Sequence, residues 1–467
     1  MLTDPSFDRP KKNLEWVLVV LSSILFGIWA VKETIALRNI LFVVGTLFSI
    51  YYIVQEWRYG ELKEQCTLWK VLPIVLVGLT FFWVISHYLF FSIDPDKQFQ
   101  ELKSTWLRAF MAFVVGLSTG LALRNYPYRL NLLWLGIFVA FLFLLYQYIP
   151  RALAQNKLLV SDYDHYLFHL KFNTVLIGMI LIAGINGALL DHLRFIHYRL
   201  SNLRLWYLIY WLVGTGIVLW AFVYIVDARN GIGQSIIFYS FWFLYVLVFF
   251  IQGQIRRPNL RSAFPLIITG AGLSLILCFA YLQTTVNKGW DNFLEDARIA
   301  VQIDRYDNWQ NLAQIGYPKR KDGQTITNSN YERIAWAIAG SRAIMTYPQG
   351  VGILAFPFVK HPQAPTKMVV GLNADGIATH SGWVELGLAF GIPMLALIFS
   401  ALFLTFLDAA RQSHPAQFTV LGFVVLIMCL FTLSEVTTKH GIEILFYLLA
   451  LMPSLLLTKP GQIESND

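Results

Sequence analysis

Charged residues are scarce in this chain of 467 residues, because Asp, Glu, Lys and Arg together make up only 14% of it. Hydrophobic residues reach 57%, aromatic residues 16%, and the mean hydropathy is +0.56. A water-soluble protein of this length carries more charge on its surface, so the composition excludes that class. It indicates a polytopic membrane protein instead.

Cysteine is also rare, with only Cys66, Cys278 and Cys429 in the whole chain. All three lie in or beside apolar stretches, and the long polar segment at residues 284–379 has none. The sequence therefore predicts neither a disulfide framework nor a cysteine-based zinc site. An internal repeat and a low-complexity tract are absent as well.

Acidic residues are fewer than basic ones, 28 against 36, which gives a formal net charge of +8. The basic residues are dispersed among short loops and do not form one patch. We therefore expect contacts with anionic membrane lipids and no nucleic-acid partner.

Long apolar runs fill most of the chain, and each is close to the ~20 residues that a helix needs to cross a bilayer. The first run has no small-residue cleavage pattern behind it, so we expect it to stay attached as a helix. The sequence thus predicts an all-α polytopic membrane protein with about 12 transmembrane helices. The predicted spans are residues 14–31, 36–54, 71–91, 106–123, 130–149, 174–190, 205–226, 233–252, 264–283, 382–406, 417–435 and 441–457.

The distribution of Lys and Arg predicts the orientation of these helices. With the N-terminus inside, most basic residues fall in inner loops, whereas the outer loops mix basic with acidic residues. We therefore expect both termini in the cytoplasm. The predicted organisation is nine helices in residues 1–283, one large outer loop at 284–379, and three helices with a short cytoplasmic tail in 380–467.

Two titratable residues, His380 and Glu385, stand where the polar segment enters an apolar span. A charged group is costly at such a place, so both are functional candidates. One interpretation of His380 is a polar residue at a helix terminus near the interface. The other is a general base that the nearby carboxylate of Glu385 orients.

Two arginines near the outer face are candidates for binding an anion. Arg229 lies between two apolar spans and is either an interfacial residue paired with Asp227 or a clamp for phosphate oxygens. Residues 329–332 (Ser-Asn-Tyr-Glu) have the form of a capping box, which predicts a helix at about 330–346 with Arg333 in its first turn. Arg342 would point about half a turn away from Arg333, so we expect only one of them to face a shared site.

Two D-x-D patterns are weak signals for a divalent metal: residues 94–96 and residues 162–164, the second followed by His165. Carboxylates at this spacing can ligate a metal ion. Both patterns are explained more simply as solvated outer loops, so we predict no metal site.

Several of these features together resemble the bacterial O-antigen ligase/polymerase superfamily. The resemblance covers residues 213–393 by motif, including Arg229, and the rest of the chain by topology only. The motifs are an arginine-bearing helix at 328–336, a P-x-G-x-G turn at 348–352, and an H-x-x-x-x-E segment from His380 to Glu385 that runs into Gly387 and Gly391.

The resemblance implies a glycosyltransferase of the GT-C type in the bacterial inner membrane, with its active site at the periplasmic face. Its donor would be a glycan on undecaprenyl pyrophosphate, and its acceptor a sugar of lipid A-core. By position, Arg229 and Arg333 correspond to substrate-binding arginines and His380 to the catalytic histidine. The family is regarded as metal-independent and uses no cofactor, and in-line displacement from an α-linked donor would invert the anomeric centre.

Two other interpretations stay open. A polysaccharide polymerase or a protein O-oligosaccharyltransferase would use the same donor with a different acceptor. A transporter of lipid-linked oligosaccharides belongs to another class and often has two similar halves with interrupted helices. This chain has one large asymmetric loop and no evident half-repeat, which favours the enzyme.

Overall fold

The computed structural model describes residues 5–59, 62, 67–124, 126, 129–159, 167–168, 170–196, 203–256, 263–310, 312–362, 377–411, 414–434 and 439–457. Most of these residues are helical and none of them forms a β-strand, while two isolated β-bridges are the extended pairs among them. Helices suit the apolar runs because a helix satisfies all its backbone hydrogen bonds internally, as a bilayer requires.

A helix is present at each of the twelve predicted positions. Nine helices in the described residues are long and apolar enough to cross a membrane, which gives an all-α polytopic membrane protein. The first six long helices are α1 (Pro5–Ile28), α2 (Ile35–Arg58), α4 (Leu68–Phe90), α6 (Leu107–Leu123), α7 (Leu130–Gln155) and α8 (Lys171–Phe195). The others are α9 (Leu205–Trp220), α10 (Arg229–Arg256), α11 (Phe264–Val286), α17 (Gly382–Arg411), α18 (Gln417–Thr432) and α19 (Lys439–Leu455).

One membrane segment begins earlier than predicted. Helix α5 (Pro95–Glu101) and a π-helical turn η1 (Leu102–Trp106) lead directly into α6 as one segment of 29 residues. Asp94 caps this segment, because its carboxylate accepts a hydrogen bond from the Lys97 backbone N–H at 3.1 Å. The expectation of a solvated loop at this D-x-D pattern is therefore wrong for Asp96, which lies in the first turn of α5.

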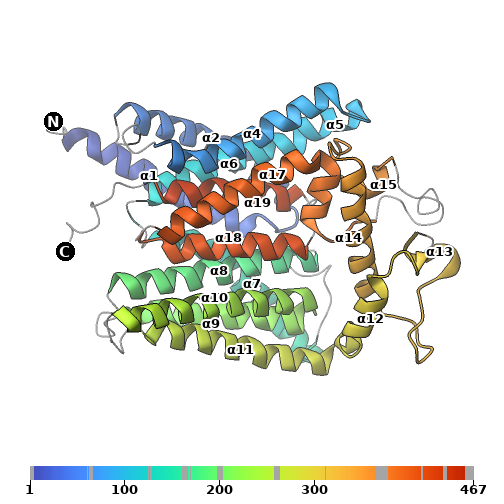
Figure 1. The fold of residues 1–467 in the computed structure, drawn as a ribbon. Helices are drawn as coiled ribbons and strands as arrows, with labels where there is room; N and C mark the ends of the chain where they lie inside the picture. The colour runs from blue at the N-terminus through green and yellow to red at the C-terminus, as the bar shows by residue number, and fades with distance from the viewer. Residues whose placement is uncertain are drawn as a thin grey trace.

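The long helices lie side by side in one bundle (Figure 1). The pairs α6–α19, α1–α7, α8–α18 and α4–α17 are in close contact. Helix α8 is innermost, since its most apolar stretch is completely buried. The start of α1 lies at the end of the bundle that is away from α12 and α14 (Figure 1).

Inside the bundle Glu443 is paired with Arg108, which offsets the cost of removing both charges from water. The Glu443 carboxylate accepts hydrogen bonds from Trp29 Nε1 at 2.8 Å and from Arg108 Nε at 2.6 Å. It thereby ties α19 to α6 and to the end of α1.

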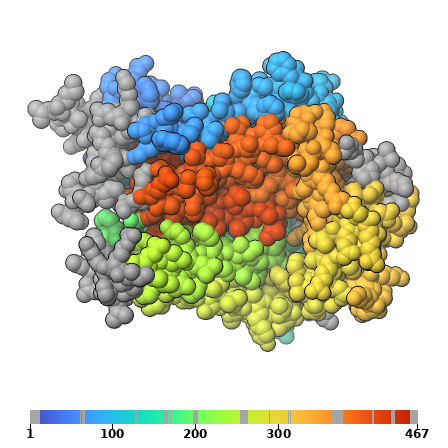
Figure 2. All heavy atoms as spheres, in the orientation of Figure 1, coloured from blue at the N-terminus to red at the C-terminus, as the bar shows by residue number. Residues whose placement is uncertain are grey.

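A separate layer of short helices, which we call the cap, covers the other end of the bundle (Figures 1 and 2). It consists of α12 (Phe293–Ala300), α14 (Asn328–Thr346), α15 (Pro357–Lys360) and the segments between them. The cap has a small hydrophobic core of its own, which includes Ile303, Tyr331, Trp336 and Phe358. It packs onto the bundle mainly through α14 and α17.

Helix α17 is broken near its first third, at Gly391, where φ is 74° and ψ is −170°. Pro393 follows two residues later and has no N–H to donate to Ala389. The break therefore leaves the carbonyl oxygens of Leu388 and Ala389 without their partners within the helix.

The backbone of the P-x-G-x-G turn at 348–352 supplies the missing hydrogen-bond partners. The N–H groups of Val351 and Gly352 donate to the two freed carbonyl oxygens at 2.9 and 2.6 Å, and Ile392 N–H donates to Pro348 O at 2.8 Å. Gly350 has a φ of +82°, and a Cβ there would lie 2.6 Å from the backbone of α17. The turn and the broken helix form a joint that fixes the cap to the membrane bundle.

We predict that Gly350→Ala destabilises the protein far more than Gly323→Ala. Gly323 has nearly the same φ, +83°, but no atom lies within 4 Å of the Cβ position. Gly323→Ala should cost about 1 kcal/mol from backbone strain alone, and Gly350→Ala about 3 kcal/mol or more because backbone atoms must move. Thermal unfolding of the purified proteins in detergent measures both. Equal losses would show that the joint is not tightly packed.

Candidate functional site

Arg229 begins helix α10, with three residues between it and a π-helical turn, η5 (Ala221–Ile225), and its side chain reaches the first turn of α14 in the cap. Its Nη1 donates a hydrogen bond to Gly289 O at 2.5 Å and its Nη2 donates to Ser329 Oγ at 2.7 Å. A Cβ on residue 289 would lie 2.2 Å from Arg229 Nη1, so glycine there makes room for the guanidinium. Arg229 is thus held by the cap and not only by the membrane surface.

Asp227, the partner considered for Arg229 from the sequence, is engaged elsewhere. Its carboxylate accepts hydrogen bonds from Asn287 Nδ2 at 2.8 and 2.9 Å. The two hydrogen bonds of the Arg229 guanidinium instead reach a carbonyl and a hydroxyl. Neither of those groups carries a charge, and the carboxylates of Asp227 and Asp296 interact with the guanidinium through space without a direct hydrogen bond.

Helix α14 was predicted within two residues, but the capping box was wrong. The helix starts at Asn328, and Thr327 is its N-cap. Ser329 lies inside the first turn and accepts the bond from Arg229. Glu332 accepts a hydrogen bond from the Tyr317 hydroxyl. The Ser and Glu of the pattern therefore serve long-range contacts instead of the helix end.

One face of α14 connects three of the predicted site residues. Ser329 contacts Arg229, and Trp336 stacks on the His380 ring at a centroid distance of 6.0 Å and an interplanar angle of 17°. Arg333 is exposed and lies four residues after Ser329 and three before Trp336, so it shares their side of the helix. The structure thus brings Arg229, Arg333 and His380 to one face.

Arg342 lies on another side of α14, as predicted. Its Nη1 and Nη2 donate to the two carboxylate oxygens of Asp304 at 2.6 and 2.9 Å. This bidentate pair is solvent-exposed and belongs to the outer surface of the cap.

His380 lies just before the first turn of α17 and is half buried. Its φ is +55°, a left-handed conformation that is uncommon for a residue with a Cβ. Such strain persists where the surroundings fix the residue, and it is often found at functional sites. Glu385, in the first turn of α17, is buried, with 1% of its surface exposed.

A second connection links the segment of His380 to the helix that begins with Arg229. Gly382 N–H donates to Ser434 O at 2.8 Å, and Gln234 Nε2 of α10 donates to Ser434 Oγ at 3.0 Å. Arg229 and His380 are therefore held relative to each other by two routes, through α14 and through Ser434.

Asp296 of α12 was missed by the sequence analysis, yet it organises the cap. It is fully buried, and its carboxylate accepts hydrogen bonds from Arg320 Nε at 2.7 Å, Asn330 Nδ2 at 2.9 Å and Thr327 N–H at 3.2 Å. Burial alone would raise its pKa, but these hydrogen bonds hold the pKa of Asp296 below its ordinary value. Asn330 also donates to Gly289 O at 3.3 Å, the oxygen that Arg229 contacts.

The side chains at this site suit an anion and a proton transfer better than a metal ion. Among the described residues no group of three or more His, Cys, Asp or Glu is placed to hold a metal. The second D-x-D pattern, residues 162–164, lies outside the described residues. The arrangement therefore offers two cationic groups, an imidazole and a carboxylate.

Comparison with known proteins gives no assignment. No protein-family model matches the chain, and no curated protein matches it. Function is therefore inferred from the residues and geometry described above.

We predict that Asp296→Asn destabilises the protein at neutral pH by about 1.5–3 kcal/mol, because charge-assisted hydrogen bonds are lost from a buried site. Since the pKa of Asp296 is lowered on folding, its contribution is fully present above the unfolded pKa of ~3.9. The contribution disappears as the pH falls through the folded pKa. The difference in unfolding temperature between parent and variant should therefore narrow below pH ~4.

Asp304→Asn is the matched control for this measurement. The pKa of Asp304 is also lowered, through its bond to Arg342, but its side chain is 79% exposed. An exposed ion pair typically contributes ~0.2–1 kcal/mol, so this variant should lose much less stability. Similar losses for the two variants would contradict the organising role of Asp296.

Proposed function

We propose that the protein is a membrane-embedded glycosyltransferase of the O-antigen ligase/polymerase type. It transfers a glycan from undecaprenyl pyrophosphate to a hydroxyl group of an acceptor sugar. The observation that carries the proposal is that one face of α14 connects two arginines, Arg229 and Arg333, with His380 at the mouth of a membrane bundle. Two cations and one base are the groups that this reaction needs.

The proposed reaction moves one proton and exchanges one bond at the anomeric carbon. His380 takes the proton of the acceptor hydroxyl as its oxygen attacks that carbon. The bond from the anomeric carbon to the phosphate oxygen breaks, and undecaprenyl pyrophosphate leaves with the electron pair. Arg229 and Arg333 stabilise the charge that grows on the pyrophosphate, which makes their contribution largest in the transition state. Attack from the opposite side inverts the anomeric centre.

The surroundings of the proposed site favour these roles. Arg229 donates its two hydrogen bonds to neutral oxygens. A charged pyrophosphate oxygen can replace one of them and form a stronger, charge-assisted hydrogen bond. Arg229 and His380 are partly buried between cap and bundle, where a polarity lower than that of water strengthens interactions between charges. The proposed role of Glu385 is to orient His380 and raise its basicity.

The proposal includes the finer features that the resemblance implies. These are a GT-C-type fold with about 12 spans, the bacterial inner membrane as location, and the periplasmic face as the side of the cap. The proposed acceptor is lipid A-core, and neither a metal nor a cofactor takes part. Transfer to a growing glycan or to a protein hydroxyl would identify a polymerase or an O-oligosaccharyltransferase with the same donor chemistry.

We predict different defects for the base and the arginines in proteoliposomes supplied with undecaprenyl-pyrophosphate-linked glycan and lipid A-core. His380→Ala should bind donor nearly normally but turn over ~10²–10⁴-fold more slowly. Arg229→Ala and Arg333→Ala should weaken donor binding about ten- to a hundred-fold, because each removes a charge-assisted bond of ~1.5–3 kcal/mol. Arg→Lys should rescue only in part, since an ammonium lacks the bidentate fork.

Two controls accompany this assay. Arg298→Ala removes an exposed arginine from α12 of the cap, and it should leave donor binding unchanged. EDTA should not inhibit the parent protein. If His380→Ala binds donor poorly yet turns over normally at saturation, His380 is part of the phosphate clamp and not the base. Absence of any transfer, with every acceptor tried, would leave the enzyme proposal without support.

We also predict that the cap lies outside the cytoplasm. In a variant without native cysteines, Lys321→Cys and Met345→Cys should react with a membrane-impermeant thiol reagent in intact spheroplasts, because both positions are exposed on the cap. Tyr59→Cys, exposed after α2 at the predicted inner end, should react only after lysis. The reverse pattern would invert the orientation of the whole bundle.

A further inference from the structure

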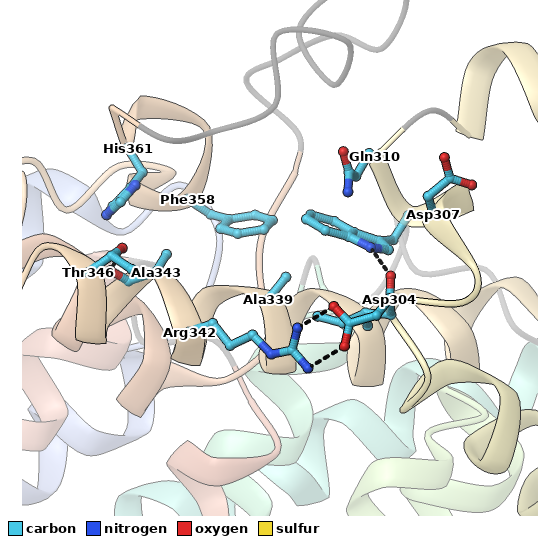
Figure 3. Close-up of a pocket in the computed structure, with 11 residues that line it drawn as sticks. Asp304, Asp307, Gln310, Ala339, Arg342, Ala343, Thr346, Phe358 and His361 are labelled. Carbon is cyan, nitrogen blue, oxygen red and sulfur yellow. Dashed lines mark hydrogen bonds and ion pairs between the residues drawn. The ribbon is translucent and has the colours of Figure 1, made fainter.

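The cap contains a groove that the proposed reaction does not use. Its volume is about 370 Å³, and it lies between the C-terminal half of α14, the short helix α15 and a 3₁₀ turn, η8 (Asp307–Gln310) (Figure 3). Aromatic, polar and small aliphatic side chains line it. The ones that matter below are Trp309, Phe358, Asp304, Asp307, Gln310 and Arg342.

The aromatic part of the groove consists of the rings of Trp309 and Phe358. Their centroids are 6.4 Å apart and their planes are inclined by 27°. Both rings are fixed, because Phe358 is 96% buried and Trp309 Nε1 donates a hydrogen bond to Ile303 O at 3.1 Å. A rigid apolar surface of this kind loses little entropy when a ligand settles on it.

The polar part surrounds this surface. Arg342 and Asp304 form their bidentate pair at one edge, and Asp307 and Gln310 lie at another (Figure 3). Burial lowers the pKa of the His361 imidazole, which also lines the groove, so this ring is neutral at physiological pH. The lining thus carries two carboxylates and one guanidinium, an excess of one negative charge.

This combination selects one class of ligand. A phosphate or another anion is disfavoured by the excess negative charge. A purely apolar ligand would leave the polar edges unused. A pyranose ring has a flat face of C–H groups and hydroxyls around its edge. It can therefore lie against the exposed part of the Trp309 ring and hydrogen-bond the carboxylate, guanidinium and amide groups at the same time.

We propose that this groove is a saccharide-binding subsite, which holds a sugar residue of the glycan donor or of the acceptor beside the reaction centre. The identity of the glycan rests on the function proposed above, whereas the binding of a sugar rests on the groove itself. The bound sugar stacks on Trp309, and its hydroxyls contact the pair of Asp304 and Arg342.

Trp336 connects the groove to His380. Its Nε1 donates a hydrogen bond to the backbone oxygen of Trp309 at 3.3 Å, and its indole stacks on the His380 ring at a centroid distance of 6.0 Å. Trp336 therefore lies between the residue that lines the groove and the proposed base. The subsite would hold one sugar residue of the glycan while His380 acts on the neighbouring sugar residue.

The test uses the full-length protein in lipid nanodiscs and two free probes. One is the glycan released from the undecaprenyl-pyrophosphate donor by mild acid, and the other is the core oligosaccharide released from lipid A. Saturation-transfer NMR measures binding of each, since it detects weak ligands and reports which ring protons touch the protein. We expect binding of one probe, with the strongest signals from C–H protons of one sugar face. The probe that binds identifies donor or acceptor as the source.

Variants then assign the binding to the groove. Trp309→Ala should weaken binding about tenfold or more, and Trp309→Phe should weaken it less because it keeps an aromatic face. Ala343→Trp fills the groove without removing any aromatic ring, so it should abolish binding even if Trp309→Ala folds poorly. Phe293→Ala and Met345→Ala are the controls, since both change exposed residues of the cap outside the groove. Inorganic phosphate should not displace the probe.

The results separate this proposal from that of the enzyme. If neither probe binds the parent protein, or if binding survives both Trp309→Ala and Ala343→Trp, the subsite is overturned even when glycan transfer is observed. If a probe binds in a Trp309-dependent manner while no transfer occurs, the subsite stands and the enzyme proposal fails. If transfer occurs and the subsite is correct, Ala343→Trp should raise the KM for the substrate that carries the bound sugar. The KM for the other substrate should stay unchanged.

Discussion

The hydrogen bonds of one buried carboxylate, that of Asp296, hold the cap in the arrangement on which the candidate site depends. The Asp296 carboxylate accepts hydrogen bonds from a guanidinium, a side-chain amide and a backbone N–H. These donors lie 24 to 34 residues away in the sequence, and one of them is in the first turn of α14. Asn330 shares its amide with Gly289 O, and Gly289 O receives Arg229. A cap without this carboxylate would leave a buried guanidinium unpaired and α14 without a fixed starting point.

The candidate site lies between the membrane bundle and the cap. The membrane bundle supplies Arg229 and the start of α17, and the cap supplies Arg333 and Trp336. Groups that stabilise charge act best when they are held in place before the reaction begins. Here the hydrogen bonds of the joint at Gly350 and Gly391, together with those of Ser434, hold the cap on the bundle.

Much of the bundle could be predicted from the sequence because a bilayer leaves few alternatives to an apolar helix. The extension of the span at 106–123 back to Pro95 was missed, because a helix made of Pro95-Asp96-Lys97 and polar residues has no apolar signal. His380 and Glu385 could be found because polar groups are conspicuous at an apolar boundary. Asp296 could not, because its sequence pattern is that of an ordinary surface helix and its partners are distant in the chain. The contact between Arg229 and Ser329 spans 100 residues, and local patterns carry no information about it.

The joint between the turn at 348–352 and the broken helix α17 limits how this sequence can change over evolutionary time. At Gly350 and Gly391 the atoms that would meet a Cβ are backbone atoms, so no substitution elsewhere can make room for one. Apart from such glycines, which include Gly116 and Gly136 between helices, an apolar position of the bundle needs only an apolar residue of suitable size. Distant relatives that have lost general similarity should therefore still share the spacing of these glycines and of Pro393, and that short pattern is the mark by which they can be recognised.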